Sequence, residues 1–203
     1  LTDAGKQLFV NSILWAAGTL DEGGDGIDGL IGYWPLDGSA ADASGNGADG
    51  NVINPDGVWV EDAGRSAYKS GGGSYIELGS LPVIGGDTDF TWSFWVNASA
   101  SGVNDIVFGN RYGPDGVDFA PREFIKFTPT KFEWHFDGAG QNTADAPFVE
   151  GVWAHNLVVK SGSTLTYYRD GAEVATGEVT GGPVNPQPLY LGGQAVDGAA
   201  VEN

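Results

Sequence analysis

Residues 151–177 read GVWAHNLVVKSGSTLTYYRDGAEVATG, and this stretch decides the fold class. Its segments 152–160 and 164–169 are rich in β-branched and aromatic residues, which is typical of strands. Asp170 and Gly171 follow the second segment, and an Asp-Gly pair between two such runs is a strong signal for a two-residue β-hairpin. The stretch therefore predicts consecutive antiparallel strands.

Other segments repeat the period of two that is expected of half-buried strands. DFTWSFWVN (89–97) and KFEWHFDG (131–138) alternate large apolar residues with other side chains, and PLYLGG (188–193) begins a further short strand. From residue 30 onward no long helical pattern separates these strands. The sequence therefore predicts an all-β fold, an antiparallel β-sandwich.

The N-terminal residues show a different pattern. Residues 1–20 carry apolar side chains at helical spacing and predict one N-terminal α-helix, with its body over 2–20. Residues 21–29, DEGGDGIDG, form an acidic Gly-rich linker. The helix either docks on the β-sandwich of residues 30–203 or ends a preceding domain.

The composition excludes several classes of partner. The 203-residue chain has 27 Asp and Glu against 9 Lys and Arg, which gives a formal charge of −18 at pH 7. Such a surface repels nucleic acids and anionic membranes. No apolar stretch is long enough to insert into a membrane. The acidic surface fits either simple solubility or the binding of divalent cations, and the absence of cysteine excludes disulfides and thiolate chemistry.

Five segments occur in an order that is shared with a known family. GLIGYWPLDGSAADASGNGADG (29–50) resembles the opening of bacterial laminin-G-like domains of the concanavalin A-like lectin/glucanase superfamily. The segments that follow in the family's order are VWVEDAGRSAYKSGGGSYIEL (58–78), FTWSFWV (90–96), the 151–177 hairpin with Trp153 and His155, and PLYLGG (188–193). The resemblance implies a jelly-roll sandwich.

The resemblance also implies that the C-terminal part is incomplete. Family members usually continue past the Leu-Gly-Gly strand into a closing strand, whereas this sequence ends at Asn203. A missing strand leaves backbone donors and acceptors unpaired along an edge. We therefore expect self-association through the edge at residues 188–193, or a strand supplied by a neighbour.

The loop DASGNGADG, residues 42–50, contains the candidate metal ligands. Calcium takes six to eight oxygen ligands, and glycines let backbone carbonyls turn inward. The alternative is a glycine-rich turn held by hydrogen bonds from Asp and Asn side chains to the backbone. In the resembled family this loop often holds a calcium ion, so the resemblance implies Ca²⁺ as a cofactor. The predicted ligands are Asp42, Ser44, Asn46 and Asp49.

Candidate ligand-binding residues follow from the way family members bind glycans, which is on the concave sheet and its loops. Aromatic rings stack on sugars, and planar polar groups bind hydroxyls. The predicted ligand-binding residues are Trp95, Arg111, Tyr112, Glu133 and His135. Core packing is the alternative for Trp95, and a solvated strand face is the alternative for Glu133 and His135.

No catalytic residue is predicted. Glycosidases of this superfamily commonly carry a Glu-x-Asp-x-x-Glu arrangement, which does not occur in this sequence. A Gly-x-Ser-x-Gly elbow and a His-Glu-x-x-His zinc motif are also missing. His155 lies in a predicted strand, where a structural role is the favoured interpretation.

Two functional hypotheses remain. The first is a non-catalytic carbohydrate-binding or cell adhesion module of a larger extracellular protein, stabilised by calcium, secreted or displayed on a bacterial surface, with a glycan or a cell-surface protein as its partner. The second is a structural subunit or protein–protein assembly domain of a surface layer or filament. Sugar-specific retention on a glycan array supports the first, and stable oligomers support the second.

Overall fold

The computed structural model describes most of the chain between residues 7 and 202 and consists of strands joined by turns and loops in that part. The described residues are 7–12, 30–56, 58–70, 74–78, 89–97, 105–109, 123–127, 131–136, 140–145, 151–178, 189–192, 194–196 and 200–202. The strands are β1 (Gln7–Ser12), β2 (Asn51–Ile53), β3 (Trp59–Asp62), β4 (Arg65–Tyr68), β5 (Tyr75–Glu77), β6 (Phe90–Asn97), β7 (Asp105–Gly109), β8 (Glu123–Phe127), β9 (Phe132–Phe136), β10 (Gly140–Ala144), β11 (Ala154–Ser161), β12 (Thr164–Arg169), β13 (Ala172–Glu178), β14 (Tyr190–Leu191), β15 (Gln194–Val196) and β16 (Ala200–Glu202).

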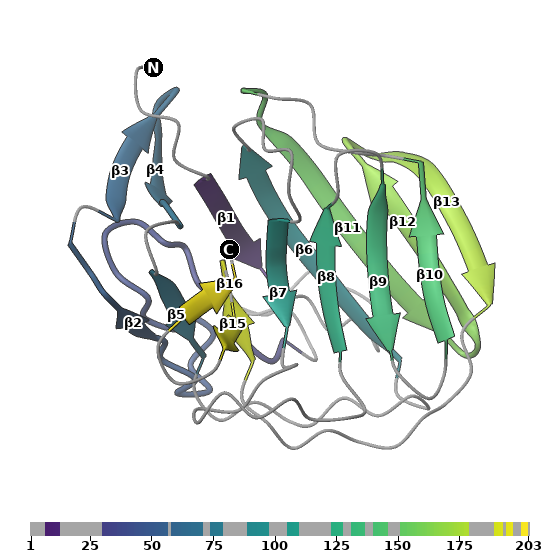
Figure 1. Cartoon of the computed structure of the whole chain (residues 1–203), viewed down its shortest axis with the longest axis horizontal. Helices are drawn as coiled ribbons and strands as arrows, with labels where there is room; N and C mark the ends of the chain where they lie inside the picture. The colour runs from purple at the N-terminus through teal and green to yellow at the C-terminus, as the bar shows by residue number, and fades with distance from the viewer. Residues whose placement is uncertain are drawn as a thin grey trace, which may run out of the picture.

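The described strands form two large antiparallel sheets that lie one in front of the other (Figure 1). The first, called the β6 sheet, has seven strands in the order β13-β12-β11-β6-β1-β4-β3 among the described residues. The second, called the β9 sheet, has the order β10-β9-β8-β7-β14-β5-β2. At one edge of the sandwich β10 lies beside β13. The prediction of an all-β antiparallel fold is confirmed.

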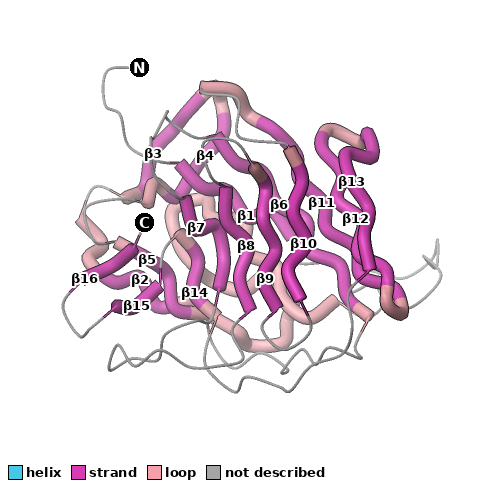
Figure 2. The backbone as a smooth tube through the Cα atoms, turned by 45° about the vertical axis from the view of Figure 1, so that its right-hand side comes forward, coloured by secondary structure: helices cyan, strands magenta, loops and turns pink. Residues whose placement is uncertain are grey.

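The core fills the space between the two sheets, as the alternation in β6 predicts. Phe90, Trp92, Phe94 and Val96 are buried on the inner face of β6. Across the sandwich, Phe132 of β9 stacks on Tyr167 of β12 with ring centroids 4.0 Å apart and an interplanar angle of 9°. These contacts show which face of each strand is internal, and Figure 2 shows the same strands after a turn of 45°.

The hairpin that the sequence predicts from Asp170 and Gly171 is confirmed. β11, β12 and β13 are consecutive antiparallel neighbours in the β6 sheet. Asp170 and Gly171 have φ values of 50° and 80°. Positive φ at both central residues is the geometry of the tight turn that Asp-Gly favours, because Gly has no Cβ to clash.

The predicted N-terminal helix over 2–20 is wrong for residues 7–12, which form β1. Strand β1 lies between β6 and β4, with Leu8 opposite Val96 and Phe9 opposite Trp95. Residues 7–12 also include consecutive residue types that favour strands. Pairing with the two neighbouring strands outweighs the local preference for a helix. The rest of 1–20, and the predicted linker 21–29, lie outside the described residues.

The predicted free edge at residues 188–193 is also not found. Strand β14 pairs with β7 on one side and with β5 on the other, so its backbone is internal to the β9 sheet. After β14, the strands β15 and β16 pair with each other, and β15 lies against β7 (Figure 1). Self-association through a β14 edge is therefore not supported, because that strand has neighbours on both sides.

Candidate functional site

The 42–50 loop is organised around the carboxylate of Asp42. One oxygen, Oδ1, accepts hydrogen bonds from the backbone N–H groups of Tyr33 at 2.9 Å and Ser44 at 2.8 Å. The other, Oδ2, accepts from the Ser44 hydroxyl at 2.8 Å and from the backbone of Ala48 at 3.0 Å. A carboxylate has about four lone-pair sites, so all of those of Asp42 are engaged.

The same contacts set the ionisation of Asp42. Burial alone would raise the pKa of its carboxyl group, because a charged group loses hydration. The hydrogen bonds from Tyr33, Ser44 and Ala48 stabilise the charged form and outweigh burial, so that the pKa is lowered below 3.8. Asp42 therefore stays ionised at neutral pH as the anchor of the loop.

The other predicted calcium ligands also lie in this loop. The Asn46 amide donates to the carbonyls of Leu30 at 2.7 Å and Ile31 at 3.0 Å, so two backbone oxygens converge at its nitrogen. Asp49 accepts a hydrogen bond from the backbone of Asp42 at 2.8 Å. The structure thus brings Asp42, Ser44, Asn46 and Asp49 together, as the sequence predicts.

The hydrogen bonds of the 42–50 loop are those of a turn, and its oxygen atoms match the ligands of a cation only in part. Among the described residues no group of three or more His, Cys, Asp or Glu side chains could hold a metal ion. The oxygens of Asp42, Oδ1 of Asp49 and the carbonyls of Leu30 and Ile31 all accept hydrogen bonds within the loop, so a calcium ion here would have to replace some of these bonds. The calcium assignment stays a prediction.

The second group of predicted residues lies on the outer face of the β9 sheet. Phe132 is buried in the core, so alternation along β9 places positions 133 and 135 on the opposite, outer face. Glu133 is half-buried there. The structure therefore brings the positions of Glu133 and His135 together, whereas Arg111 and Tyr112 lie outside the described residues.

Cross-strand neighbours extend this outer face over three strands. Lys126 of β8 and Thr143 of β10 lie opposite Glu133 in the register. Phe124 and Gln141 lie opposite His135 in the same way. Positions 124, 126, 141 and 143 were not predicted, because the strands that pair with 132–136 follow from tertiary structure and not from local alternation. We call these six positions, 124, 126, 133, 135, 141 and 143, the β9 face.

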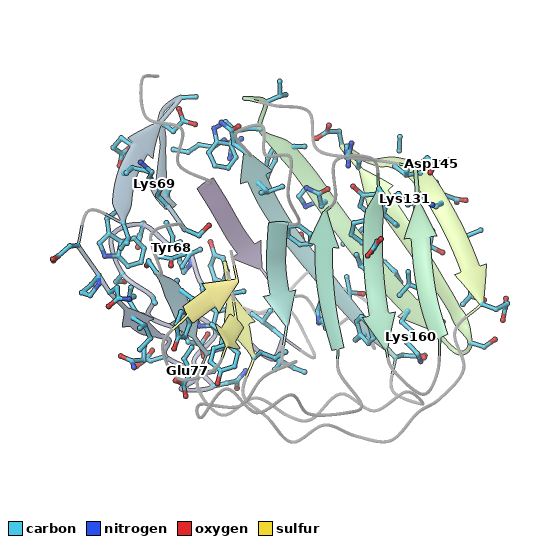
Figure 3. All side chains as sticks on the ribbon, in the orientation of Figure 1. Tyr68, Lys69, Glu77, Lys131, Asp145 and Lys160 are labelled. Atoms are coloured by element: carbon cyan, nitrogen blue, oxygen red, sulfur yellow. The ribbon has the colours of Figure 1, made fainter. Side chains whose placement is uncertain are left out.

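An ion pair lies at the end of the β9–β10 hairpin. Lys131 precedes β9 and Asp145 follows β10, and their side chains lie 3.9 Å apart (Figure 3). Both are exposed, so the pair contributes little to stability. It does place one charge of each sign at the rim of the β9 face.

Trp95 lies on the other side of the molecule. Its neighbours Phe94 and Val96 face the core, so Trp95 is on the outer face of the β6 sheet, opposite to the β9 face. The guanidinium of Arg65 lies 4.2 Å from the centroid of the Trp95 ring, and the ring of His155 lies 5.2 Å from it. The structure therefore separates Trp95 from Glu133 and His135.

His155 belongs to this second group. Its Nε2 lies 2.8 Å from the Ser93 hydroxyl, and the backbone N–H of His155 donates to the carboxylate of Asp170 at 2.9 Å. Burial lowers the pKa of His155, and the nearby charge of Asp170 opposes that effect without cancelling it. These contacts agree with the structural role that the sequence favours for His155.

Asp62 is a structural residue that sequence analysis missed. It is buried at the end of β3, and its Oδ2 accepts from the side chains of Asn97 and Trp153, each at 2.9 Å. These contacts tie the β3–β4 hairpin to β6 and to the start of β11. A single Asp with no spacing relation to its partners carried no signal in the sequence.

In the part of the chain that the structure describes, there is no helix that is long and apolar enough to cross a membrane. A laminin-G-type family model, described as the concanavalin A-like lectin/glucanases superfamily, matches residues 70–201. The comparison with curated proteins gives no match.

Several solved structures resemble the chain. Domain 4 of AbnA, a GH43 extracellular arabinanase from Geobacillus stearothermophilus solved in complex with arabinotriose, shares 17% identity and a TM-score of 0.54 over 80% of this chain and 82% of that chain. The carbohydrate-binding module CBM66 from Bacillus subtilis shares 14% identity and a TM-score of 0.41, covering 70% of this chain and 86% of its own. Bacillus licheniformis β-glucanase shares 12% identity and a TM-score of 0.39, covering 93% of this chain and 85% of its own.

The arabinanase domain supports the fold, and the family model covers well over half of the chain. Two antiparallel sheets with a shared aromatic core agree with both. This chain belongs to the concanavalin A-like lectin/glucanases superfamily, as a laminin-G-type domain.

Proposed function

We propose that the domain is a non-catalytic carbohydrate-binding module and that it binds an oligosaccharide on the β9 face. The observation that carries the proposal is the register of β8, β9 and β10, which assembles Lys126, Glu133 and Thr143 in one row and Phe124, His135 and Gln141 in the next. In the register the two rows are successive positions on the same side of three neighbouring strands.

This mixture of residue types suits a sugar. Carboxylate, amide, hydroxyl and imidazole groups form hydrogen bonds with sugar hydroxyls, while an aromatic ring packs on the apolar face of a pyranose or furanose. Strands hold such groups more rigidly than loops do, which lowers the entropic cost of binding. The positions of the β9 face therefore carry both residue types that bind oligosaccharides, polar and aromatic.

Relatives support the same class of ligand. The arabinanase domain was solved with arabinotriose, and it belongs to an extracellular bacterial enzyme. We extend the proposal to an oligosaccharide partner and to a secreted or surface-displayed setting. A role in adhesion to a glycan-bearing surface is consistent with the same binding face.

Binding without turnover is the favoured form of the function. Hydrolysis of a glycosidic bond requires two carboxyl groups, about 5–5.5 Å apart in retaining enzymes and roughly 6.5–9.5 Å apart in inverting ones. Among the six positions of the β9 face, Glu133 is the single carboxylate. With one carboxylate among these six positions, recognition is the chemistry that these residues support.

We further propose that calcium stabilises the 42–50 loop. Support comes from the oxygen-bearing side chains of Asp42, Ser44, Asn46 and Asp49 within this one loop, in which the carboxylate of Asp49 is exposed. Calcium ligands of this mixed type, a carboxylate with amide and backbone oxygens, are common. The ion would fix the loop, and it has no part in binding the sugar on the β9 face.

A glycan array with four proteins tests the binding proposal. We expect the wild-type chain to be retained by a defined class of oligosaccharide, and Glu133→Gln and His135→Ala to lose at least ~10-fold in affinity, since each lost polar contact removes about 1.4 kcal/mol or more. Glu173→Gln is the matched control, because Glu173 is an exposed carboxylate on β13 of the other sheet. Equal binding by all four proteins would contradict the proposal.

A further inference from the structure

Asn46 and Gly47 form an Asn-Gly pair in the 42–50 loop, and the sequence contains no other such pair. Where glycine follows asparagine, the backbone nitrogen of the glycine can attack the carbon of the side-chain amide, because glycine has no Cβ to obstruct the approach. The product is a five-membered succinimide ring, and this reaction is one reason why asparagine is a thermolabile residue. The structure decides whether the pair is accessible to the reaction.

Both residues of the pair are exposed. Gly47 has a φ of 76°, and apart from its chain neighbours no heavy atom lies within 4 Å of the place that a Cβ would take. In the part of the chain that the structure describes, the backbone N–H of Gly47 makes no hydrogen bond. The attacking nitrogen is therefore open to solvent base, and there is room for the ring to form.

The amide of Asn46 has a specific structural role that depends on its being a donor. Its Nδ2 donates to the half-buried backbone carbonyls of Leu30 at 2.7 Å and Ile31 at 3.0 Å, which ties the loop to residues 30–31. A carboxylate at position 46 would accept hydrogen bonds and donate none. The two carbonyls would then lose their donor and face a negative charge, so this tie would break.

We propose that Asn46 is a site of spontaneous deamidation and that the modification releases the 42–50 loop from residues 30–31. The backbone nitrogen of Gly47 loses its proton to solvent base and bonds to Cγ of Asn46. The bond from Cγ to Nδ2 breaks, and the nitrogen leaves as ammonia. Water then opens the ring at either of its two carbonyls, which leaves an aspartyl or an isoaspartyl residue at position 46. Water is the one co-reactant, and nothing is oxidised or reduced.

The other anchors of the loop do not use Asn46. The carboxylate of Asp42 still accepts from the backbone N–H groups of Tyr33 and Ala48. The indole nitrogen of Trp34 still donates to the carbonyl of Ala48 at 2.8 Å. The modified chain should therefore stay folded, with a loss of stability that is confined to the contact with residues 30–31.

The first experiment incubates the folded full-length chain in mildly alkaline buffer with a chelator and maps its peptides by mass spectrometry. We expect the mass gain of an amide-to-acid change at Asn46, with aspartyl and isoaspartyl forms both present. Asn51 and Asn54 are controls in the same digest, because both are exposed and neither should react. Val52 hinders attack after Asn51 through its branched side chain, and Pro55 after Asn54 has no N–H.

The chain unfolded in urea provides the reference for this reaction. A mass gain at Asn46 of the folded chain above the Asn51 background supports the proposal. If the unfolded chain reacts at Asn46 while the folded chain stays at that background, the fold protects the pair and the proposal is overturned. If neither form reacts at Asn46, the proposal is overturned as well.

The second experiment measures the release of the loop. Asn46→Asp should lower the Tm by roughly 4–8 °C, because two hydrogen bonds are lost in a chain of this size. Ser39→Asp adds the same charge at an exposed position without touching Leu30 or Ile31, and its Tm should change little. The deamidated wild-type fraction, separated by anion exchange, gives the same comparison without a substitution. If both Asn46→Asp and this fraction melt with Ser39→Asp, release of the loop is overturned. All melts contain a chelator, so the result does not depend on whether the loop binds calcium.

Discussion

Asp62 and Trp153, separated by 91 residues in the sequence, meet in a hydrogen bond of 2.9 Å from the indole nitrogen to the carboxylate. The same carboxylate oxygen accepts from Asn97. One buried acid therefore holds together the β3–β4 hairpin, strand β6 and the entry to β11.

Asp62→Ala should lower the free energy of unfolding by about 2–4 kcal/mol, since buried donors lose a charged acceptor. Urea denaturation measures this free energy, and Asp56→Ala, at an exposed position, is the control in which it should change little.

Asp42 should make the domain sensitive to acid. Its pKa is lower in the folded chain than its ordinary value of 3.8, so its contribution to stability is present above pH 3.8 and is lost as the pH falls through the folded pKa. Asp42→Ala should therefore be less stable than the wild type at pH 7, and the difference should shrink in acid. Thermal melts across this range test it, with exposed Asp37→Ala as the matched control. A difference that does not change with pH would contradict the assignment.

His155 should give a second pH dependence of the same sign. Its pKa is lowered by burial below 6.5, so the unfolded chain binds a proton more readily than the folded chain. Its contribution is fully present above pH 6.5 and falls as the pH drops from 6.5 toward the folded pKa. Melting curves between about pH 5 and pH 8 should show this slope, and His155→Gln should flatten it. A slope that His155→Gln leaves intact would point to another group, and His135→Gln is the control for the second histidine.

Calcium removal tests the 42–50 loop. With ~1 mM calcium and a dissociation constant near 10 µM, binding adds about 2.7 kcal/mol, which corresponds to a shift in Tm of roughly 5–10 °C for a domain of this size. A chelator should lower the Tm of the wild type by that amount. Asp49→Asn should melt at the lower temperature and no longer respond. An unchanged wild-type Tm would show that the hydrogen bonds of Asp42 are sufficient to hold the loop.

The two outer faces should behave differently in binding. Position 135 is on the β9 face, so His135→Ala should lose oligosaccharide binding. Trp95 lies on the outer face of the β6 sheet, so Trp95→Phe should retain that binding. Affinity electrophoresis of the folded variants compares them directly. Loss of binding in Trp95→Phe alone, with normal melting, would move the site to the other sheet.

The strands that local pattern specifies were predicted well. Alternation in 89–97 predicted β6 and its buried face, and Asp170-Gly171 predicted the β12–β13 turn, because both signals reside in neighbouring residues. Residues 7–12 were predicted as helix because their strand state depends on partners at 65–68 and 90–97. No local signal reports a neighbour that is more than 50 residues away.

The candidate site shows the same limit. Alternation placed positions 133 and 135 on one face of their strand, and it correctly gave Phe94 and Trp95 opposite directions. It could not tell that β6 and β9 belong to different sheets, so Trp95 was grouped with residues from which the core separates it. Strand faces follow from sequence period, whereas the assignment of strands to sheets follows from tertiary packing.

The β9 face and the outer face of the β6 sheet point in opposite directions, so a second protein bound to the outer face of the β6 sheet would leave the sugar platform open. Several copies of the domain on one particle would carry several such platforms. Weak sites joined in this way gain avidity on a repeating polymer, by roughly 10²–10⁴ over a single site when the spacing allows both to engage. Short oligosaccharides would register none of that gain, and an extended polysaccharide would.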